Sequence, residues 1–279
     1  MLLGAHLRKL REAKGVSREE AGYLIRGSES KISRMELGRV SFKERDVADL
    51  LTLYGLNDEE ERNALLTLAR DANRPGWWHR EGDILPNWFQ SYMGLEAAAS
   101  LIRTYEVQFV PGLLQTADYA RAVILLGHRQ APATEVERRV DLRMKRQRLL
   151  NRPDPPLLWV VIDEGALRRL VGGREVMRAQ LEALIDASKM PNVRIQVIPF
   201  EYGGHAAAGG SFALLRFPDQ DLPDVVYVEQ LNSALYIDKR EDVEQYLVSM
   251  EQLCIEADPP ARTPEVLGKI LRDFEAMDE

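Results

Sequence analysis

The sequence has little cysteine and little histidine. Among its 279 residues there is one cysteine, Cys254, and there are four histidines, His6, His79, His128 and His205. A single cysteine cannot form an intrachain disulfide, which agrees with a reducing cytoplasm. The histidines are scattered, with no second metal ligand at short helical spacing, so we expect no metal site.

Long apolar runs are also missing. No stretch approaches the roughly 18 apolar residues of a membrane span, and the N-terminus lacks the apolar segment of a signal peptide. We therefore expect a cytoplasmic protein without a membrane partner. The 45% apolar and 29% charged residues suit a protein with packed cores, and the length suggests two domains.

Residue patterns typical of enzymes are scarce. The glycines of the segment 203–210 lie between two predicted strands, whereas a phosphate-binding loop runs from a strand into a helix. A flexible hairpin loop is the commoner explanation for them. Asp163 and Glu164 are adjacent carboxylates, but neighbouring side chains point apart. No nucleophile elbow occurs in the sequence. We therefore expect neither an enzyme nor a cofactor.

Positive charge is confined to one end of the chain. Residues 1–45 hold 11 Lys and Arg against 6 Asp and Glu, a net charge of +5. The remaining residues hold 26 against 38, a net charge of −12. A local positive field attracts DNA even on a protein with an overall charge of −7. The distribution predicts a basic N-terminal DNA-binding region and an acidic body for sensing or docking.

The segment 17–26 has the pattern of a short amphipathic helix that leads into a tight turn. Ser17 is the expected N-cap, because its hydroxyl can accept a hydrogen bond from a free amide of the first turn. Ala21 and Gly22 are small, so a second helix can cross closely, and Gly27 supplies the turn. Two helices at a steep angle, joined by such a turn, are typical of a helix-turn-helix.

The second helix of this pair, over 28–39, is the predicted recognition helix. Ser28 is its expected N-cap, Ile32 and Met35 lie on one inward face, and Gly38 ends it. Its outward side chains suit base edges and phosphates. The alternative is a basic helical hairpin with no DNA partner. The residues predicted to bind DNA are Ser17, Arg18, Ser28, Glu29, Ser30, Lys31, Ser33, Arg34 and Arg39.

The rest of the chain gives a clear order of elements. The break at Asn73–Gly76 places a domain boundary near residue 75. We predict an all-α lambda-repressor-like helix-turn-helix domain over 1–75 and a larger α+β domain with a mixed sheet of four to six strands over 76–279. Further helices are expected over 2–14, 42–54 (with Ser41 as cap), 58–72, 87–100, 116–127, 134–150, 164–170, 175–188, 240–256 and 264–277. Strands are expected over 101–110, 157–163, 193–200, 211–217, 225–231 and 234–238.

Aromatic residues gather just after the expected boundary. They could line a pocket, or they could be the ordinary core of a larger domain, which is the commoner case. A site for an effector or partner would use Trp77, Trp78, Trp88, Phe89 and Tyr92, together with Tyr105 and His205.

Residues 2–55 resemble the lambda-repressor-like, Xre-type regulators. The resemblance implies a five-helix bundle in which the position of Arg18 contacts a DNA phosphate. It also implies that four positions face the major groove, those of Ser28, Glu29, Ser30 and Arg34. The family usually has glycine where this chain has Arg26, and here glycine follows one residue later, at Gly27.

Further motifs resemble an actinobacterial group of regulators, the WhiJ-like proteins, which pair an Xre-type N-terminus with a C-terminal domain of unknown function. The motifs are residues 106–121, 162–167, 196–200 and 209–212. The resemblance implies transcription control, and members are often encoded beside a small partner protein in an antitoxin-like arrangement.

Two hypotheses follow from these patterns. In the first, the chain is a sequence-specific transcriptional regulator whose C-terminal domain binds a partner protein or a small effector. In the second, it is an antitoxin-like module that neutralises a small neighbour-encoded protein and autoregulates its own operon. Both need a double-stranded DNA operator. Because one recognition helix contacts few bases, we expect a homodimer that binds two half-sites about 34 Å apart and pairs through residues after 75.

Overall fold

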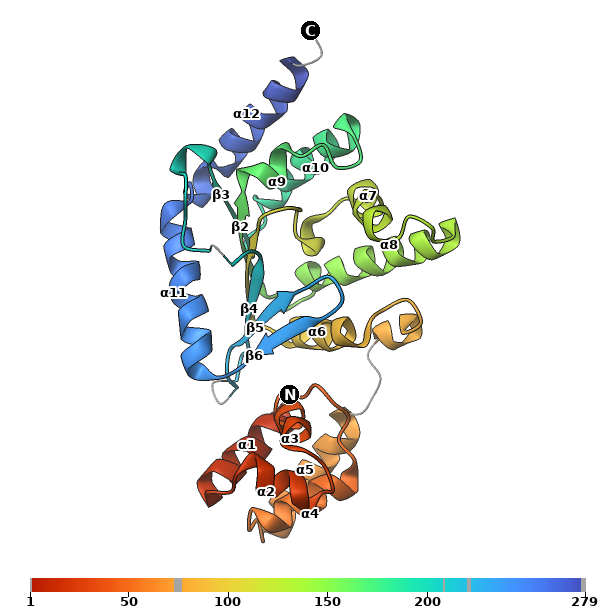
Figure 1. The fold of residues 1–279 in the computed structure, drawn as a ribbon, viewed down its shortest axis with the longest axis vertical. Coiled ribbons are helices and arrows are strands. Elements are labelled where there is room, and N and C mark those ends of the chain that lie inside the picture. The colour runs from red at the N-terminus through yellow and green to blue at the C-terminus, as the bar shows by residue number, and fades with distance from the viewer. Residues whose placement is uncertain (1, 73–76, 208, 220–221, 277–279) are drawn as a thin grey trace. The chain divides into compact units, whose positions relative to one another are not determined.

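The computed structural model describes residues 2–72, 77–207, 209–219 and 222–276 (Figure 1). The contacts divide the chain into two compact units. The N-terminal unit holds the described parts of 1–82, 86–98 and 217–223, and the C-terminal unit those of 83–85, 99–216 and 224–279. The predicted order, a helical region followed by a larger α+β region with a mixed sheet, is confirmed. The predicted break at Asn73–Gly76, with the boundary near residue 75, lies outside the described residues.

The N-terminal unit is built from helices, and the first five of them share one apolar core. Its helices are α1 (Leu2–Lys14), α2 (Arg18–Leu24), α3 (Glu29–Glu36), α4 (Glu44–Leu53), α5 (Glu59–Ala72), the 3-10 helix η1 (Trp77–Glu81) and α6 (Asn87–Ala98). Ile32 and Met35 of α3 are each 1% exposed and pack with Leu7, Leu50 and Leu51. The inward face predicted for the recognition helix is therefore correct. The core of the N-terminal unit comes from apolar residues at helical spacing, as the sequence indicates.

Three helices of this unit end at a glycine with left-handed backbone. These are Gly15, Gly38 and Gly55, with φ of 71°, 63° and 79°. In each case the next residue's amide donates to the carbonyl five residues earlier, which is the Schellman motif. Helix α2 ends in the same pattern, and the Gly27 amide makes that bond at 2.8 Å. However, the residue with left-handed backbone there is Arg26, with φ of 53°. The sequence suggested that Gly27 forms this turn, but Gly27 only supplies the amide that closes it.

The start of the fourth helix was predicted wrongly. Ser41 was expected to cap the fourth helix, and this is wrong. The N-cap of α4 is Lys43, which makes no side-chain cap bond, because the helix begins only at Glu44. Asp58, which was predicted to lie in the first turn of the fifth helix, instead precedes α5, and its carboxylate accepts a hydrogen bond from the Glu61 amide at 2.7 Å.

The C-terminal unit is organised on a six-stranded mixed sheet. Its strands are β1 (Leu101–Glu106), β2 (Leu157–Asp163), β3 (Val193–Ile198), β4 (Phe212–Arg216), β5 (Val225–Glu229) and β6 (Ala234–Ile237), in the order β3-β2-β1-β4-β5-β6. The first three strands are parallel and the others antiparallel. β1 is shorter than predicted because the following amides bond side chains. Val107 donates to the Ser211 hydroxyl at 3.2 Å, and Val110 donates to the Tyr119 hydroxyl at 3.1 Å.

Helices lie on both faces of this sheet. They are α7 (Ala117–Gly127), α8 (Ala133–Gln147), α9 (Glu164–Arg168), α10 (Arg174–Ala187), α11 (Arg240–Glu256) and α12 (Thr263–Ala276), with 3-10 helices η2 (Gly112–Leu114), η3 (Arg148–Asn151), η4 (Phe200–Tyr202) and η5 (Pro260–Arg262). In Figure 1, α11 covers one face alone and α7 to α10 lie on the other. Val243, Met250 and Leu253 of α11 pack against Tyr105 and Val161 of the sheet. Among the described residues, no helix has the length and apolar content needed to cross a membrane.

The outer edge of β3 is covered by the chain that follows α11. The Asp258 amide donates to the carbonyl of Val197 at 2.9 Å, and the Thr263 hydroxyl donates to the carbonyl of Ile195. The Gln196 amide reaches the carbonyls of Cys254 and Asp258, at 3.0 Å each. The bonds to the carbonyls of Ile195 and Val197 occupy groups that an edge strand otherwise leaves open for pairing with another chain.

A carboxyl group is desolvated at the C-terminal end of β1. Glu106 accepts a hydrogen bond from the Thr104 hydroxyl at 3.0 Å. Burial, together with the nearby Glu229 carboxylate, raises the pKa of Glu106 to about 7. A proton at this position therefore stabilises the fold.

Candidate nucleic-acid interface

Serine hydroxyls cap both helices of the predicted pair. Ser17 Oγ accepts from the Glu20 amide at 3.1 Å, and Ser28 Oγ accepts from the Lys31 amide at 3.2 Å. Both caps were predicted from the sequence. Because each oxygen acts as an acceptor here, each hydroxyl keeps its hydrogen for donation to another group, such as a phosphate oxygen.

Glycines allow α3 to lie close to its two neighbours. A Cβ on Gly22 of α2 would lie 2.9 Å from the carbonyl carbon of Ser28, and a Cβ on Gly4 of α1 would lie 2.3 Å from the carbonyl oxygen of Glu36. Both approaches are shorter than a real side chain allows. The close crossing at Gly22 was expected, whereas Gly4 was not singled out. Together they fix both ends of α3.

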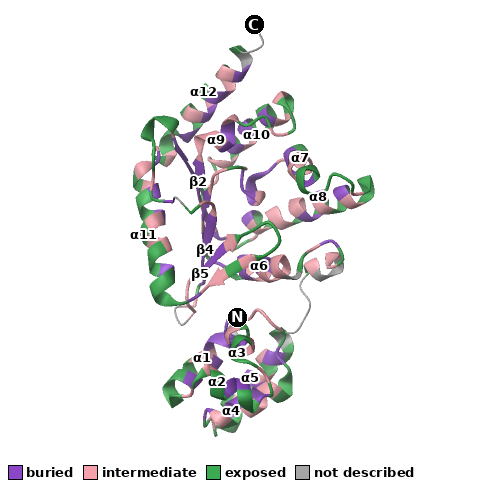
Figure 2. Cartoon of the chain, in the orientation of Figure 1, coloured by how far each residue is buried: buried purple, intermediate pink, exposed green. Residues whose placement is uncertain are grey.

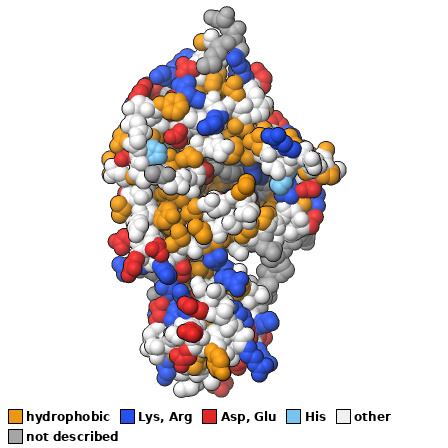
Figure 3. Space-filling view, viewed as in Figure 1, with side chains coloured by type: hydrophobic (Ala, Val, Ile, Leu, Met, Phe, Trp, Pro, Cys, Tyr) orange, Lys and Arg blue, Asp and Glu red, His pale blue; other side chains and the backbone are white. Residues whose placement is uncertain are grey.

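The outward face of α3 carries three exposed side chains, those of Glu29, Ser30 and Arg34. The Arg34 Nε donates to the Ser30 carbonyl at 3.2 Å. Ser33 and Arg39 are half-buried beside this face. The space-filling view in Figure 3 shows blue Lys and Arg side chains along the margins of the N-terminal unit.

Two of the predicted DNA-binding cations have partners within the protein. The Lys31 ammonium lies 2.6 Å from an Asp46 carboxylate oxygen on α4, whereas the sequence suggested that Lys31 points away from the bundle. The Arg18 Nε lies 2.9 Å from a Glu36 carboxylate oxygen. These ion pairs hold α3 against α4 and α2. Arg34 is the most exposed of the four predicted DNA-binding cations.

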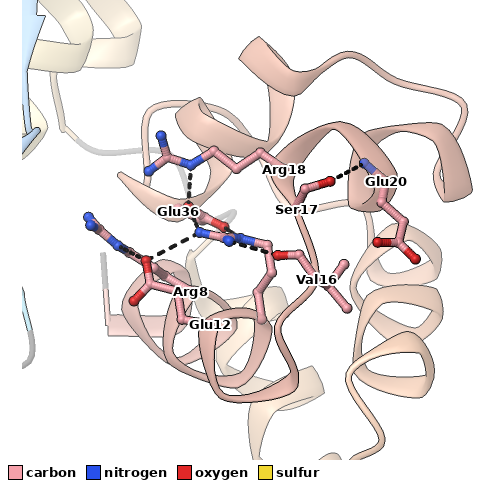
Figure 4. Close-up of polar contacts among 8 residues, drawn as sticks. Arg8, Glu12, Val16, Ser17, Arg18, Glu20 and Glu36 are labelled. Atoms are coloured by element: carbon pink, nitrogen blue, oxygen red, sulfur yellow. Dashed lines mark hydrogen bonds and ion pairs between the residues drawn. The ribbon is translucent and has the colours of Figure 1, made fainter.

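Glu36 is the centre of a buried ionic cluster, drawn in Figure 4. It is 4% exposed, and it accepts from Arg18 and from Arg11, whose second terminal nitrogen lies 3.2 Å away. Arg11 also donates to the Val16 carbonyl at 3.0 Å. Burial lowers the pKa of Arg11, but its hydrogen bond and attraction to Glu36 outweigh burial and hold that pKa above its ordinary value.

One carboxylate therefore joins α1, α2 and α3. Glu36 is not among the residues predicted from the sequence. The available signal was its position four residues after the inward-facing Ile32, which places both side chains on one side of the helix.

The aromatic residues proposed for an effector divide between the two units. Trp77 and Trp78 make an edge contact with ring centroids 5.8 Å apart, and Phe89 stacks on Tyr92 at 5.7 Å. Trp88 contacts Phe89 at 5.9 Å. Tyr92 is 6% exposed whereas Trp77 is 45% exposed, so this group lies partly in the core and partly at the surface.

Tyr105 and His205 lie in the C-terminal unit. The Tyr105 hydroxyl and His205 Nε2 are 2.8 Å apart, and Asp163 lies 4.0 Å from the same nitrogen. A cavity of about 240 Å³ lies nearby, at the end of β4. Its lining includes Ser211, Phe212, Gln245, Tyr246 and Ser249. The cavity was not predicted, because residues from a loop, the sheet and α11 together form it.

Comparison with known families gives two matches. Residues 2–65 match a helix-turn-helix domain, and residues 89–269 match a domain of unknown function, DUF5753. No curated protein matches the chain, and no solved structure matches it.

Proposed function

The chain belongs to the DUF5753 family and carries an N-terminal helix-turn-helix domain, and from this premise we propose that it is a sequence-specific DNA-binding transcriptional regulator. The observation that carries the proposal is α3, which is held by close glycine contacts to two helices while its outer face presents Ser30 and Arg34 to solvent. A rigid helix with this outward chemistry suits the major groove, where arginine can bind guanine through two hydrogen bonds.

Charge supports the same proposal. The first 45 residues carry a net charge of +5 on an otherwise acidic chain. Phosphate contacts position a protein on the duplex, and base contacts select the sequence. We assign base reading to Arg34 and Ser30. Positioning on phosphates falls to the hydroxyls of Ser17 and Ser28 and to Arg39, with Arg18 contributing while it also holds Glu36.

The experiment begins with sequencing the DNA fragments that the protein retains from a genomic library. Titrations of the selected operator then compare the wild type with Arg34→Ala and Arg34→Lys. We expect Arg34→Ala to weaken binding by about 1–3 kcal/mol and to relax preference at one base pair. Arg34→Lys should lose most of that preference, because lysine lacks the planar fork of arginine.

Arg178→Ala in the C-terminal unit is the matched control, since it removes one exposed cation that lies on α10. Its operator affinity should equal that of the wild type. Wild-type affinity and sequence preference in Arg34→Ala at low salt would show that α3 does not read DNA through this residue.

We further propose that the protein acts as a homodimer and that its C-terminal unit receives a small neighbour-encoded protein or a small effector. Two half-sites supply the contacts that one helix cannot. The cavity at the end of β4 supports a small effector, because its aromatic and polar lining is typical of ligand sites. Any ligand that changes operator affinity must bind the DNA-competent and DNA-incompetent states differently.

The alternative is an antitoxin-like module that neutralises its neighbour. Operator titrations with and without the neighbour-encoded protein, together with growth assays of that neighbour expressed alone, separate the two functions. A neighbour that is toxic alone and harmless with this chain favours the module.

A further inference from the structure

Helix α11 has two faces of different composition. Its inner face, with Val243, Met250 and Leu253, is buried against the sheet. Its outer face exposes two apolar side chains seven residues apart, Val248 at 61% and Ile255 at 76%. Figure 1 places α11 on the flank of the C-terminal unit, and Figure 2 shows exposed residues along it. Seven residues are close to two helical turns, so Val248 and Ile255 form one stripe.

An open groove of about 790 Å³ continues this stripe at the C-terminal end of α11. Ile255, Trp159, Pro259 and Pro260 line it with apolar surface. Arg194 also lines it, with its guanidinium 5.1 Å from the centre of the Trp159 ring. Among the residues that the structure describes, Arg194 has no carboxylate partner, although the C-terminal unit is acidic. The groove therefore pairs an apolar wall with an available cation.

The other end of the same stripe is negative. Glu241 and Glu244 lie seven and four residues before Val248, on this stripe. Asp242 and two exposed cations, Lys239 and Arg240, also lie at this end of α11. Within the described part of the chain, Glu244 has no cationic partner. This helix face thus carries two carboxylates at one end, then Val248 and Ile255 with Glu251 and Gln252 between them, and then a groove lined by the Arg194 cation.

A face with this order is complementary to the same face of a second copy that lies antiparallel to it. In an isologous pair, residue i contacts j while j contacts i. In such a pair, Val248 of each copy packs against Ile255 of the other. Glu244 lies four residues before Val248, and Pro259 lies four residues after Ile255, so Glu244 of one copy is opposite Pro259 of the other. Glu244 of each copy then reaches the groove that holds the partner's Arg194. The centre of the pair is formed by Glu251 and Gln252, which places a carboxylate beside an amide and avoids two carboxylates face to face.

We propose that α11 and its adjoining groove form the surface through which two copies of this chain associate antiparallel. The occupant of the groove is the acidic N-terminal half of the second copy's α11. The inference rests on the homodimer proposed above and names its surface.

Sedimentation velocity of the full chain, from about 1 to about 100 µM, tests the surface at concentrations that span weak and stable association. We expect a wild-type dimer and a Val248→Glu monomer. Leu231→Glu is the matched control, because Leu231 is fully exposed in the β5–β6 connection and its substitution should leave the dimer intact. Circular dichroism confirms that each variant is folded.

A charge exchange provides an independent test. Glu244→Arg and Arg194→Glu should each weaken the dimer about tenfold, since each removes two symmetric ion pairs. The double variant should recover most of the affinity, because it restores opposite charges at the same contacts. A misfolded variant cannot produce such recovery.

Cross-linking fixes the register. In a Cys254→Ser background, chains with Val248→Cys are mixed with chains with Ile255→Cys and treated with a short bis-maleimide. Mixed cross-links should form faster than either self-cross-link.

A dimer that persists in Val248→Glu, or a double charge variant no better than the single ones, overturns this surface and leaves the pairing itself standing. A wild-type monomer throughout overturns both. Neither result bears on operator reading by α3, which the Arg34 variants test separately.

Discussion

Replacing Arg26 by glycine should stabilise the helix-turn-helix. Four helices of the N-terminal unit end in the same hydrogen-bonded motif, and three of them place glycine at the left-handed position. Only α2 places a residue with a Cβ there, Arg26 with φ of 53°. Left-handed backbone costs a non-glycine residue roughly 1–2 kcal/mol.

The stability expected to be gained from Arg26→Gly is smaller than this backbone cost. Glycine has more conformational freedom in the unfolded chain, which offsets about 0.4–1 kcal/mol. The Arg26 side chain is exposed, and no ion pair or hydrogen bond of its guanidinium occurs among the described residues. We therefore expect Arg26→Gly to raise the free energy of local unfolding by about 0.5–1 kcal/mol.

Hydrogen exchange of the α2 and α3 amides in the full chain measures this local free energy. Arg26→Ala is the control, because alanine removes the guanidinium and keeps the Cβ in the left-handed conformation. Arg26→Ala should exchange like the wild type, and Arg26→Gly about two- to fivefold more slowly. If the two variants exchange equally, left-handed backbone strain at residue 26 does not limit the stability of this motif. Slower exchange accompanied by weaker operator binding would show that the arginine is kept for DNA contact.

Two further predictions concern buried polar groups. Tyr54→Phe should be neutral or stabilise by up to about 1 kcal/mol, because the buried Tyr54 hydroxyl has no hydrogen-bond partner among the described residues; a loss of more than about 1 kcal/mol in urea unfolding would contradict this. The pKa of Glu106 is about 7 in the folded protein, against an ordinary 4.5, so the folded state binds this proton more tightly than the unfolded state does. The proton's contribution to stability, up to about 3 kcal/mol, is therefore full below pH 4.5 and is lost as the pH rises through 7. Glu106→Gln should remove this part of the pH dependence, which exchange of the β1 amides at pH 5 and pH 8 would measure, and an unchanged dependence would assign it to another group.

The elements of this fold follow from local patterns in the sequence. Strand β2 and helix α11 match their predicted ranges because each is a bounded apolar or amphipathic segment with clear turn residues on both sides. The caps at Ser17 and Ser28 were predictable because a hydroxyl and a nearby amide three residues later make a local contact.

Interactions between distant residues were not predictable in the same way. Glu36 lies 25 residues from Arg11 and 18 from Arg18, and a glutamate near a helix end ordinarily indicates a solvated surface. The partner of Lys31, Asp46, lies on the next helix, so no pattern within α3 could reveal it. The strand order is also absent from local patterns, because β4 returns beside β1 more than 100 residues later.

The covered edge of β3 has a consequence for synthesis of the protein. While the chain leaves the ribosome, β1, β2 and β3 can pair as soon as residue 198 has emerged. The groups on the outer side of β3 then wait for Asp258 and Thr263, which are made about 60 residues later. At roughly 5–20 residues per second, this interval lasts several seconds. During this interval the nascent sheet has an open edge. That edge can pair with a neighbouring nascent chain on the same messenger RNA.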